Sequence, residues 1–159
     1  MKLCIVAVGH KLPEWVAKGC AEYIKRMPRE LPLLVVEIKP EARGARGAKT
    51  REQLLAAEKT RMQATLQGFK RIVVLDERGA DLTTLKLAQR LQDWMRNGGD
   101  TAFIIGGADG IDEALKRQAD ETFRLSSLTL PHAMARLILC EQLYRAVSVI
   151  NNHPYHREG

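Results

Sequence analysis

The end of the chain concentrates side chains that could do chemistry. Residues 151–159 contain four such groups: His153, Tyr155, His156 and Arg157. Histidine exchanges protons near neutral pH, an aromatic ring stacks on a nucleobase, and arginine holds a phosphate. Chain ends commonly fray, so a disordered tail is the alternative, which Pro154 and Tyr155 beside the histidines weaken. The two histidines alone do not indicate a metal site, because a third ligand is missing.

A second candidate is a glycine-rich segment, residues 105–112. It carries three glycines within five positions: Gly106, Gly107 and Gly110. Glycines let a backbone approach a ligand closely, and Asp109 or Asp112 can cap the helix expected after them. The segment has neither the GxGxxG pattern of dinucleotide-binding folds nor the GK(S/T) end of a phosphate-binding loop. By itself it fits a ligand contact and a tight structural turn equally well.

Two further loops follow expected strands directly. Residues 125–132 read Leu-Ser-Ser-Leu-Thr-Leu-Pro-His, an apolar stretch with hydroxyl groups. Backbone N–H and C=O groups in such an apolar wall suit recognition of an adenine edge, and a buried connection is the alternative. Residues 76–79, Asp-Glu-Arg-Gly, are more typical of a solvated turn than of a binding site.

Short apolar segments alternate with segments of helical period, which predicts the elements that position these loops. Strands are expected over residues 3–8, 33–38, 71–76, 101–105 and 122–125. Helices are expected over residues 13–27, from about 51 to 66, and over 83–95, 111–119 and 133–150.

This alternation predicts an α/β fold, with one domain over residues 1–159, a mostly parallel sheet and helices on both faces. Residues 71–76 are apolar on both faces and are therefore expected to form a central strand. In such sheets ligands bind beyond the carboxyl ends of the strands, so the loops that leave the strands are the expected binding regions.

Composition narrows the class of protein. The chain has 159 residues, a net charge of +6 and a pI near 9.4, which favours a polyanionic partner such as nucleic acid; a basic but otherwise ordinary enzyme is the alternative. Three scattered cysteines without a CxxC pair favour a reduced, cytoplasmic protein without a disulfide framework or zinc site. Residues 1–9 lack a cleavage signal, and no apolar stretch reaches the roughly 20 residues that span a bilayer, so no membrane association is expected.

Taken together and in this order, the motifs resemble those of the ribosomal RNA large-subunit methyltransferase H family, a minimal member of the SPOUT class. The resemblance covers essentially the whole chain through Val6-Ala7-Val8-Gly9, Glu22-Tyr23, Leu75-Asp76, Ile105-Gly106-Gly107, Leu128-Thr129-Leu130-Pro131-His132, Glu141-Gln142-Leu143-Tyr144-Arg145-Ala146 and Asn152-His153-Pro154-Tyr155-His156. Two positions depart from the family. Ala80 stands where members often have a basic residue, which puts a cation there in doubt. Residues 108–109 read Ala-Asp where members often have Pro-Glu, which keeps the acid.

The resemblance implies a knotted region over about residues 101–159, in which the last helix is threaded through a loop and S-adenosylmethionine is bound. It implies an obligate homodimer that methylates N3 of a pseudouridine in the helix 69 hairpin loop of 23S ribosomal RNA, in the assembled ribosome. The matching donor-site residues are Leu75, Gly106, Gly107, Leu125, Ser126, Ser127, Leu128, Thr129 and Leu130. His153, Tyr155, His156 and Arg157 would face the base, and no metal is expected. In a dimer, the tail and the donor pocket of one active site can come from different chains.

The N3 proton of a pseudouridine must leave or be weakened before methyl transfer. Arg157 or a histidine would lower the effective pKa of the ring imide, and Tyr155 would stack on the base or position it. The sequence does not choose between His153 and His156 for this role.

Residues 39–51 carry five basic residues against one acid and are expected to form a flexible loop. With Arg26 and Arg29 they are candidates to hold the RNA backbone, and a solvated loop without contacts is the alternative. Rival functions for the whole chain are methylation of transfer RNA and a noncatalytic RNA-binding assembly factor.

Overall fold

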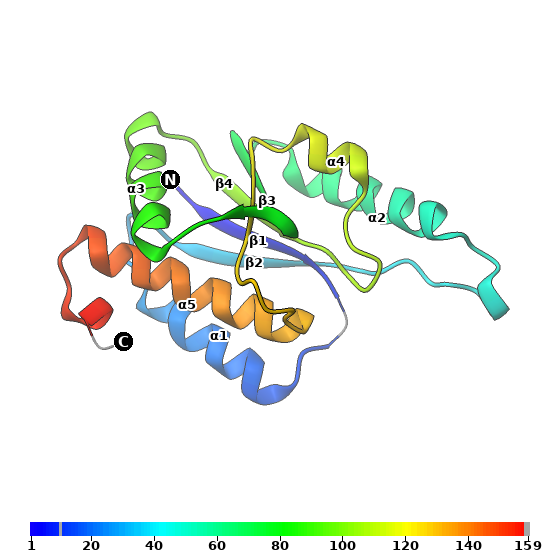
Figure 1. The fold of residues 1–159 in the computed structure, drawn as a ribbon, viewed down its shortest axis with the longest axis horizontal. Helices are drawn as coiled ribbons and strands as arrows, with labels where there is room; N and C mark the ends of the chain where they lie inside the picture. Colours follow the sequence, from blue (N-terminus) through cyan, green and yellow to red (C-terminus); the bar gives the residue numbers. More distant parts are fainter. Residues whose placement is uncertain (10, 158–159) are drawn as a thin grey trace.

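The computed structural model describes residues 1–9 and 11–157 (Figure 1). In chain order the elements are β1 (Leu3–Val8), α1 (Glu14–Arg26), β2 (Leu33–Ile38), η1 (Ala45–Gly47), α2 (Arg51–Leu66), β3 (Arg71–Asp81), α3 (Thr84–Asn97), β4 (Thr101–Ile105), α4 (Glu113–Gln118), β5 (Glu121–Arg124), α5 (His132–Ile150) and η2 (Pro154–Arg157). Each predicted helix and strand is present, with shifted ends at a few places. Residues 158 and 159 of the predicted domain lie outside the described range.

The strands form one sheet in the order β2-β1-β4-β3-β5, and all neighbouring strands run parallel. The predicted parallel α/β fold is therefore confirmed. β4 is the central strand, and all residues of β4 and β1 are buried. Residues 71–76 lie in β3, which is, as expected, an interior strand of the parallel sheet, between β4 and the short edge strand β5. Helices cover both faces of β3 as they cover both faces of β4. An apolar run therefore indicates that a strand is buried and does not indicate which strand lies in the middle of the sheet.

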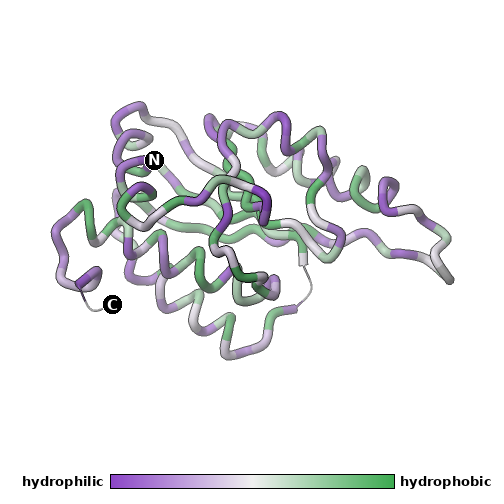
Figure 2. The backbone as a smooth tube through the Cα atoms, viewed as in Figure 1, coloured by the Kyte–Doolittle hydropathy of each residue, from purple (hydrophilic) through white to green (hydrophobic). Residues whose placement is uncertain are grey.

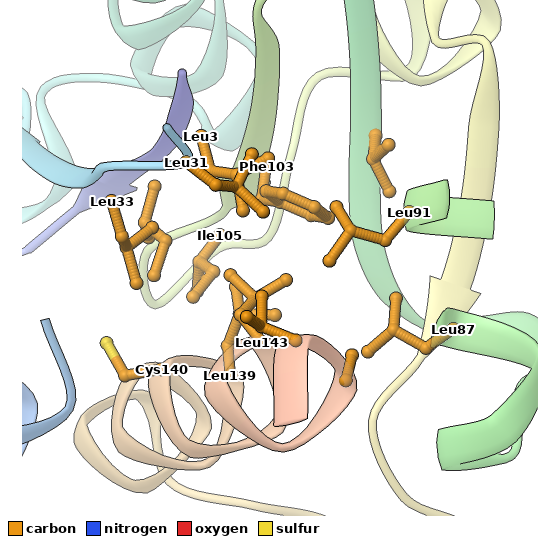
Figure 3. Packing of buried hydrophobic residues seen from close by; sticks show 14 of the residues in the cluster. Leu3, Leu31, Leu33, Leu87, Leu91, Phe103, Ile105, Leu139, Cys140 and Leu143 are labelled. Carbon is orange, nitrogen blue, oxygen red and sulfur yellow. The ribbon is translucent and has the colours of Figure 1, made fainter. Parts of the chain in front are cut away.

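Helices cover both faces of the sheet, as predicted. Side chains along a strand point alternately to opposite faces, and β1 accordingly contributes to two separate cores. Its odd-numbered residues pack with α1, α3 and α5, and its even-numbered residues pack with α2 and α4. In Figure 3 the ring of Phe103 points toward Leu91 of α3, while Leu139 and Leu143 rise from α5 toward the sheet. Figure 2 shows the same layering, with hydrophobic strands in the middle and helices that alternate between hydrophobic and hydrophilic residues.

β3 is longer than predicted and runs to Asp81. Leu75 and Ala80 both pair with Phe123 of β5, so residues 76–79 bulge out of the ladder instead of forming the turn that their composition predicts. Gly79 is needed at this point, because a Cβ atom there would lie 2.6 Å from the backbone of Phe123. The bulge directs the residues after Leu75 away from the β3–β5 ladder.

Capping side chains set the starts of two helices. Thr50 and Gln53 form a capping box at α2, with each side chain accepting from the other residue's backbone N–H at 3.1 and 2.9 Å. α4 is shorter than predicted and begins after Asp112, whose carboxylate accepts from the N–H groups of Ala114 and Leu115 at 2.9 and 3.2 Å. Of the two aspartates considered as caps, Asp112 takes this role.

Cys4, Cys20 and Cys140 are buried and free. In the part of the chain that the structure describes, no three side chains of the metal-binding types His, Cys, Asp and Glu gather at one point. None of the helices within residues 1–9 and 11–157 is both long and apolar enough to cross a bilayer.

Candidate active site

A cavity of about 570 Å³ lies where β3 and β4 part, next to the paired residues Leu75 and Ile105. Its wall consists of the three segments that the sequence singled out: the end of the β3–β4 pairing, the glycine turn of residues 106–110, and the loop that follows β5. The first turn of α5 closes one side through His132 and Ala135. The position at the end of parallel strands is the usual place for a ligand in such a sheet.

The structure brings together most residues predicted to hold a methyl donor. Eight of the nine line the cavity: Leu75, Gly106, Gly107, Leu125, Ser126, Leu128, Thr129 and Leu130. Ser127 belongs to the same loop but is not part of the wall that the described residues form. Leu128 is 75% exposed at the rim, so its side chain is available to a bound molecule.

The glycine turn is closed on itself. The N–H of Gly110 donates to the Gly107 carbonyl at 3.1 Å, and Gly110 has a φ of 86°, a conformation that L side chains rarely adopt. A Cβ atom at Gly106 would lie 2.5 Å from the Gly110 carbonyl oxygen. The turn therefore requires glycine, and the backbone of residues 106–107 faces the cavity without side chains.

The basic loop of residues 39–51 is attached to this turn. Arg43 forms an ion pair of 2.8 Å with the Asp109 carboxylate, and Arg51 donates to the Asp109 carbonyl at 2.8 Å. Arg51 is also part of the cavity wall. Lys49 and Arg61 both pair with Glu41. The expected flexible loop is thus held by ion pairs, and Arg51, considered as an RNA contact, lies where it can meet a bound donor.

An acid and a base face each other inside the cavity. The Asp76 carboxylate pairs with Lys116 of α4 at 2.6 Å and accepts from the Arg78 N–H at 2.9 Å. Burial opposes ionisation of Asp76, but the hydrogen bonds from Lys116 and from the Arg78 N–H outweigh it and lower the pKa of the carboxyl. The cavity therefore holds a fixed charge pair. Lys116 could not be predicted as a cavity residue from the sequence, because it comes from the short helix α4.

His132 and Arg136 of α5 form a polar cluster behind the glycine turn. His132 Nδ1 lies 2.9 Å from the Gly106 carbonyl oxygen, and its Nε2 lies 3.3 Å from the guanidinium of Arg136. Arg136 is 1% exposed and donates to Glu37 of β2 at 2.8 Å. Burial, helped by the charge of Arg136, lowers the pKa of His132, although the hydrogen bond with Gly106 and the charge of Glu37 oppose this shift. The sequence interpretation assigned no role to either residue.

The tail lies at the opposite end of α5. Tyr155 donates from its hydroxyl to Glu141 at 3.0 Å, lies 3.2 Å from the Tyr23 hydroxyl, and packs edge-on against Tyr144 with ring centroids 4.7 Å apart. His153 is tied to the end of α5 by its backbone N–H, which donates to the Ser148 carbonyl at 2.8 Å.

The other two tail residues, His156 and Arg157, lie with Tyr155 in η2. Arg157 donates to Asn152 at 3.2 Å, and Nδ1 of His156 is buried without a partner among the described residues. None of the four tail residues is part of the cavity wall, and Glu141, which Tyr155 contacts, lies nine residues after His132 along α5. The tail and the cavity therefore do not meet within one chain, and Figure 1 shows the red tail at the far end of α5 from the start of this helix.

A family model described as "Predicted SPOUT methyltransferase" matches residues 1–156. The chain belongs to the SPOUT methyltransferase family. It is a methyltransferase, and the resemblance stated from its motifs is confirmed. A Dechloromonas aromatica protein named ribosomal RNA large subunit methyltransferase H is 69% identical over 159 residues, which is 100% of both chains. A protein of the same name from Nitrosospira multiformis is 57% identical over 157 residues, 99% of each chain.

Solved structures of low identity share the fold of this SPOUT methyltransferase. A probable methyltransferase from Bordetella pertussis has a TM-score of 0.56 at 14% identity, over 91% of this chain and 95% of its own. A probable methylase family protein from Haemophilus influenzae has a TM-score of 0.53 at 14% identity, over 96% of this chain and 68% of its own. These likenesses support the fold alone.

Proposed function

We propose that this SPOUT methyltransferase transfers a methyl group from S-adenosylmethionine to N3 of a pseudouridine in the helix 69 hairpin loop of 23S ribosomal RNA. It acts as a cytoplasmic homodimer on the assembled ribosome. The observation that carries the proposal is the full-length, 69% identity to a protein named ribosomal RNA large subunit methyltransferase H. The net charge of +6 agrees with a polyanionic substrate.

The cavity suits S-adenosylmethionine, within a knotted region of about residues 101–159. Its volume of about 570 Å³ falls within the range of roughly 300–1,000 Å³ of small-molecule sites. Leu75 and Leu130 offer apolar surface for an adenine, while Gly106 and Gly107 offer backbone groups at close range. When bound, the donor supplies a methyl group on a positively charged sulfur. The protein contributes chiefly by fixing this group in line with the attacking nitrogen.

The tail supplies the groups that the base needs. Tyr155 stacks on the pseudouridine or positions it, and Arg157 or a histidine stabilises the anion that forms when the N3 proton leaves. Within one chain none of these residues is part of the cavity wall. A homodimer resolves this separation, because the partner's tail can reach the cavity that a chain's own tail does not reach.

The deciding experiment incubates radiolabelled donor with unmodified 70S ribosomes, isolated subunits and bulk transfer RNA, and then maps the modified nucleotide. We expect label only in 23S ribosomal RNA of 70S particles. Label in transfer RNA would support the rival substrate instead. Calorimetry with S-adenosylmethionine tests the noncatalytic alternative, because an assembly factor that has lost donor binding would show no heat of binding.

Complementation tests the shared active site. A tail variant, His153→Ala with Arg157→Ala, is mixed with the cavity variant Gly106→Ala under conditions that exchange subunits. A heterodimer then contains one site in which both the cavity and the tail are intact, so activity should return in the mixture. Two inactive variants that remain inactive after exchange would show that each chain uses its own tail. Single-turnover methylation by His153→Ala and His156→Ala separates the two histidines, and no slowing in either would refute an acid–base role.

A further inference from the structure

His132 occupies a position between the cavity and the buried interior. Its ring bridges the Gly106 carbonyl at 2.9 Å and the guanidinium of Arg136 at 3.3 Å. Arg136 in turn reaches Glu37 on the neighbouring edge strand β2, across 99 positions of sequence. The cluster therefore connects three elements, β2, α5 and the end of β4, at the turn where the donor is proposed to bind.

The partners of the ring determine its protonation. A carbonyl oxygen only accepts hydrogen bonds, so Nδ1 must carry the proton that it donates to Gly106. A guanidinium only donates, so Nε2 must be the unprotonated acceptor. Both neighbours thus select the neutral Nδ1–H tautomer, and Arg136 holds the ring in the orientation that points this N–H at Gly106.

The backbone leaves room for this arrangement. A Cβ atom at Gly9, at the end of β1, would lie 2.9 Å from Nε2 of His132 and 3.4 Å from the guanidinium of Arg136. Any larger residue at Gly9 would push the ring away from Arg136. Arg136 itself is among the largest fully buried side chains, whereas His132 is half-buried and Glu37 is exposed.

We propose that His132 and Arg136 are positioning residues for the donor site: Arg136 fixes the tautomer and orientation of His132, and His132 anchors the Gly106 carbonyl so that the Gly106–Gly107 backbone presents itself to S-adenosylmethionine. The proposal rests on the proposed donor binding. Gly106 has no side chain with which to hold its own peptide, because a Cβ atom is excluded there. The orientation of its carbonyl is instead set from behind, by the hydrogen bond from His132 of α5.

Two substitutions separate this role from simple packing. The amide of His132→Asn lies where Nδ1 lies in histidine, so this variant keeps the donation to Gly106 and loses the acceptor for Arg136. The amide of His132→Gln lies where Nε2 lies, so this variant keeps the acceptor and loses the anchor. Donor affinity by calorimetry and stability by denaturant unfolding are measured for both variants and for the wild type.

We expect the two measurements to rank the variants in opposite order. His132→Gln should be the more stable variant, because Arg136 stays satisfied, yet its donor affinity should fall by roughly tenfold, the worth of one hydrogen bond. His132→Asn should be less stable but bind the donor within about threefold of the wild type. Donor affinity that follows stability, or that falls equally in both variants, would overturn the proposal in favour of packing or of a direct ring–donor contact.

One measurement does not depend on the donor. Nitrogen NMR of the histidine rings, assigned by comparison with His132→Gln, should show the Nδ1–H tautomer for His132 at neutral pH in the free protein. An Nε2–H tautomer would refute the anchor directly. A wild type that binds no donor while His132 shows the expected tautomer would refute the proposed function instead, so the two failures are distinguishable.

Discussion

Arg43 and Asp109 form an ion pair of 2.8 Å that joins the basic loop after β2 to the glycine turn after β4. Arg51 donates to the carbonyl of the same aspartate at 2.8 Å. These two contacts therefore connect the basic loop to the wall of the cavity. Contacts of this loop with RNA phosphates would compete with contacts that hold the turn.

This connection predicts different effects for two cations of the loop. Arg51→Ala should weaken donor binding several-fold, because it removes a side chain of the cavity wall and the hydrogen bond to Asp109. Lys49→Ala should leave donor affinity unchanged, because Lys49 pairs with Glu41 instead of Asp109. Calorimetry with S-adenosylmethionine compares the two variants, which remove the same formal charge. Equal donor affinities in both would show that the loop does not support the cavity.

Alanine substitutions at two glycines of the turn should have different effects on stability and on donor binding. Gly106→Ala places a Cβ atom 2.5 Å from the backbone oxygen of Gly110, which cannot move without opening the turn. We expect a loss of about 1–3 kcal/mol in the free energy of unfolding together with loss of donor binding. Gly107→Ala is the matched control, since the atom nearest its Cβ would be in the Val8 side chain at 3.0 Å, with the nearest backbone atom at 3.8 Å. Denaturant unfolding and calorimetry should find Gly107→Ala closer to the wild type in both respects, and the reverse order would contradict this account of the turn.

The sequence allowed the fold and the position of the cavity to be predicted because those depend on local patterns. Apolar runs marked the strands, and glycines with an apolar loop marked the cavity wall. The order of the strands was not predictable, since β3 is covered by helices on both faces although it lies next to the edge. The resemblance, and not periodicity, predicted Leu75 as a donor-site residue, and Leu75 lines the cavity.

The side chains that support the cavity could not be predicted from the sequence, for a different reason. Lys116, Glu37 and Arg136 act through partners far along the chain, and the Glu37–Arg136 contact spans 99 positions. A single sequence does not indicate that positions so far apart are in contact. A charged residue in a helix is, moreover, usually exposed to solvent. Only the fold shows that Arg136 is buried and that His132 stands between it and the cavity.

The pKa of His132 predicts how stability changes with pH. An unfolded histidine titrates near 6.5, and burial lowers the pKa of His132 in the folded chain. Between these two values the unfolded chain binds more protons, so the free energy of unfolding falls as the pH drops through about 6.5. Arg136 and Glu37 face the ring from α5 and β2, and Arg136 adds to the penalty for a second positive charge.

Denaturant unfolding at pH 7.5 and 5.5 measures this effect, with His132→Gln as the control. The glutamine keeps an acceptor for Arg136 but does not titrate, so this variant should lose less stability than the wild type over the interval. The chain's other histidines are common to both proteins and cancel in the comparison. Equal losses would mean that His132 is not the buried titrating group.

The tail predicts a separation of donor binding from catalysis. Tyr155→Phe keeps the ring packed against Tyr144 and removes the hydroxyl that donates to Glu141. The free energy of unfolding should fall by about 1–2 kcal/mol, because the bond ends on a charged group. Donor affinity should not change, since no tail residue is part of the cavity wall of the same chain. Under the proposed function, methylation of ribosomes in a single turnover should nevertheless slow, because the tail that is proposed to face the base is no longer fixed to its helix.

Tyr23→Phe is the matched control for this variant. It removes the hydroxyl that lies 3.2 Å from Tyr155 but leaves the bond between Tyr155 and Glu141 intact. Its methylation rate should therefore stay closer to that of the wild type. If Tyr155→Phe lowered donor affinity as much as it lowered the methylation rate, the tail would act on the donor site and not on the base. If it changed neither, the contact with Glu141 would serve only to complete the fold at the end of α5.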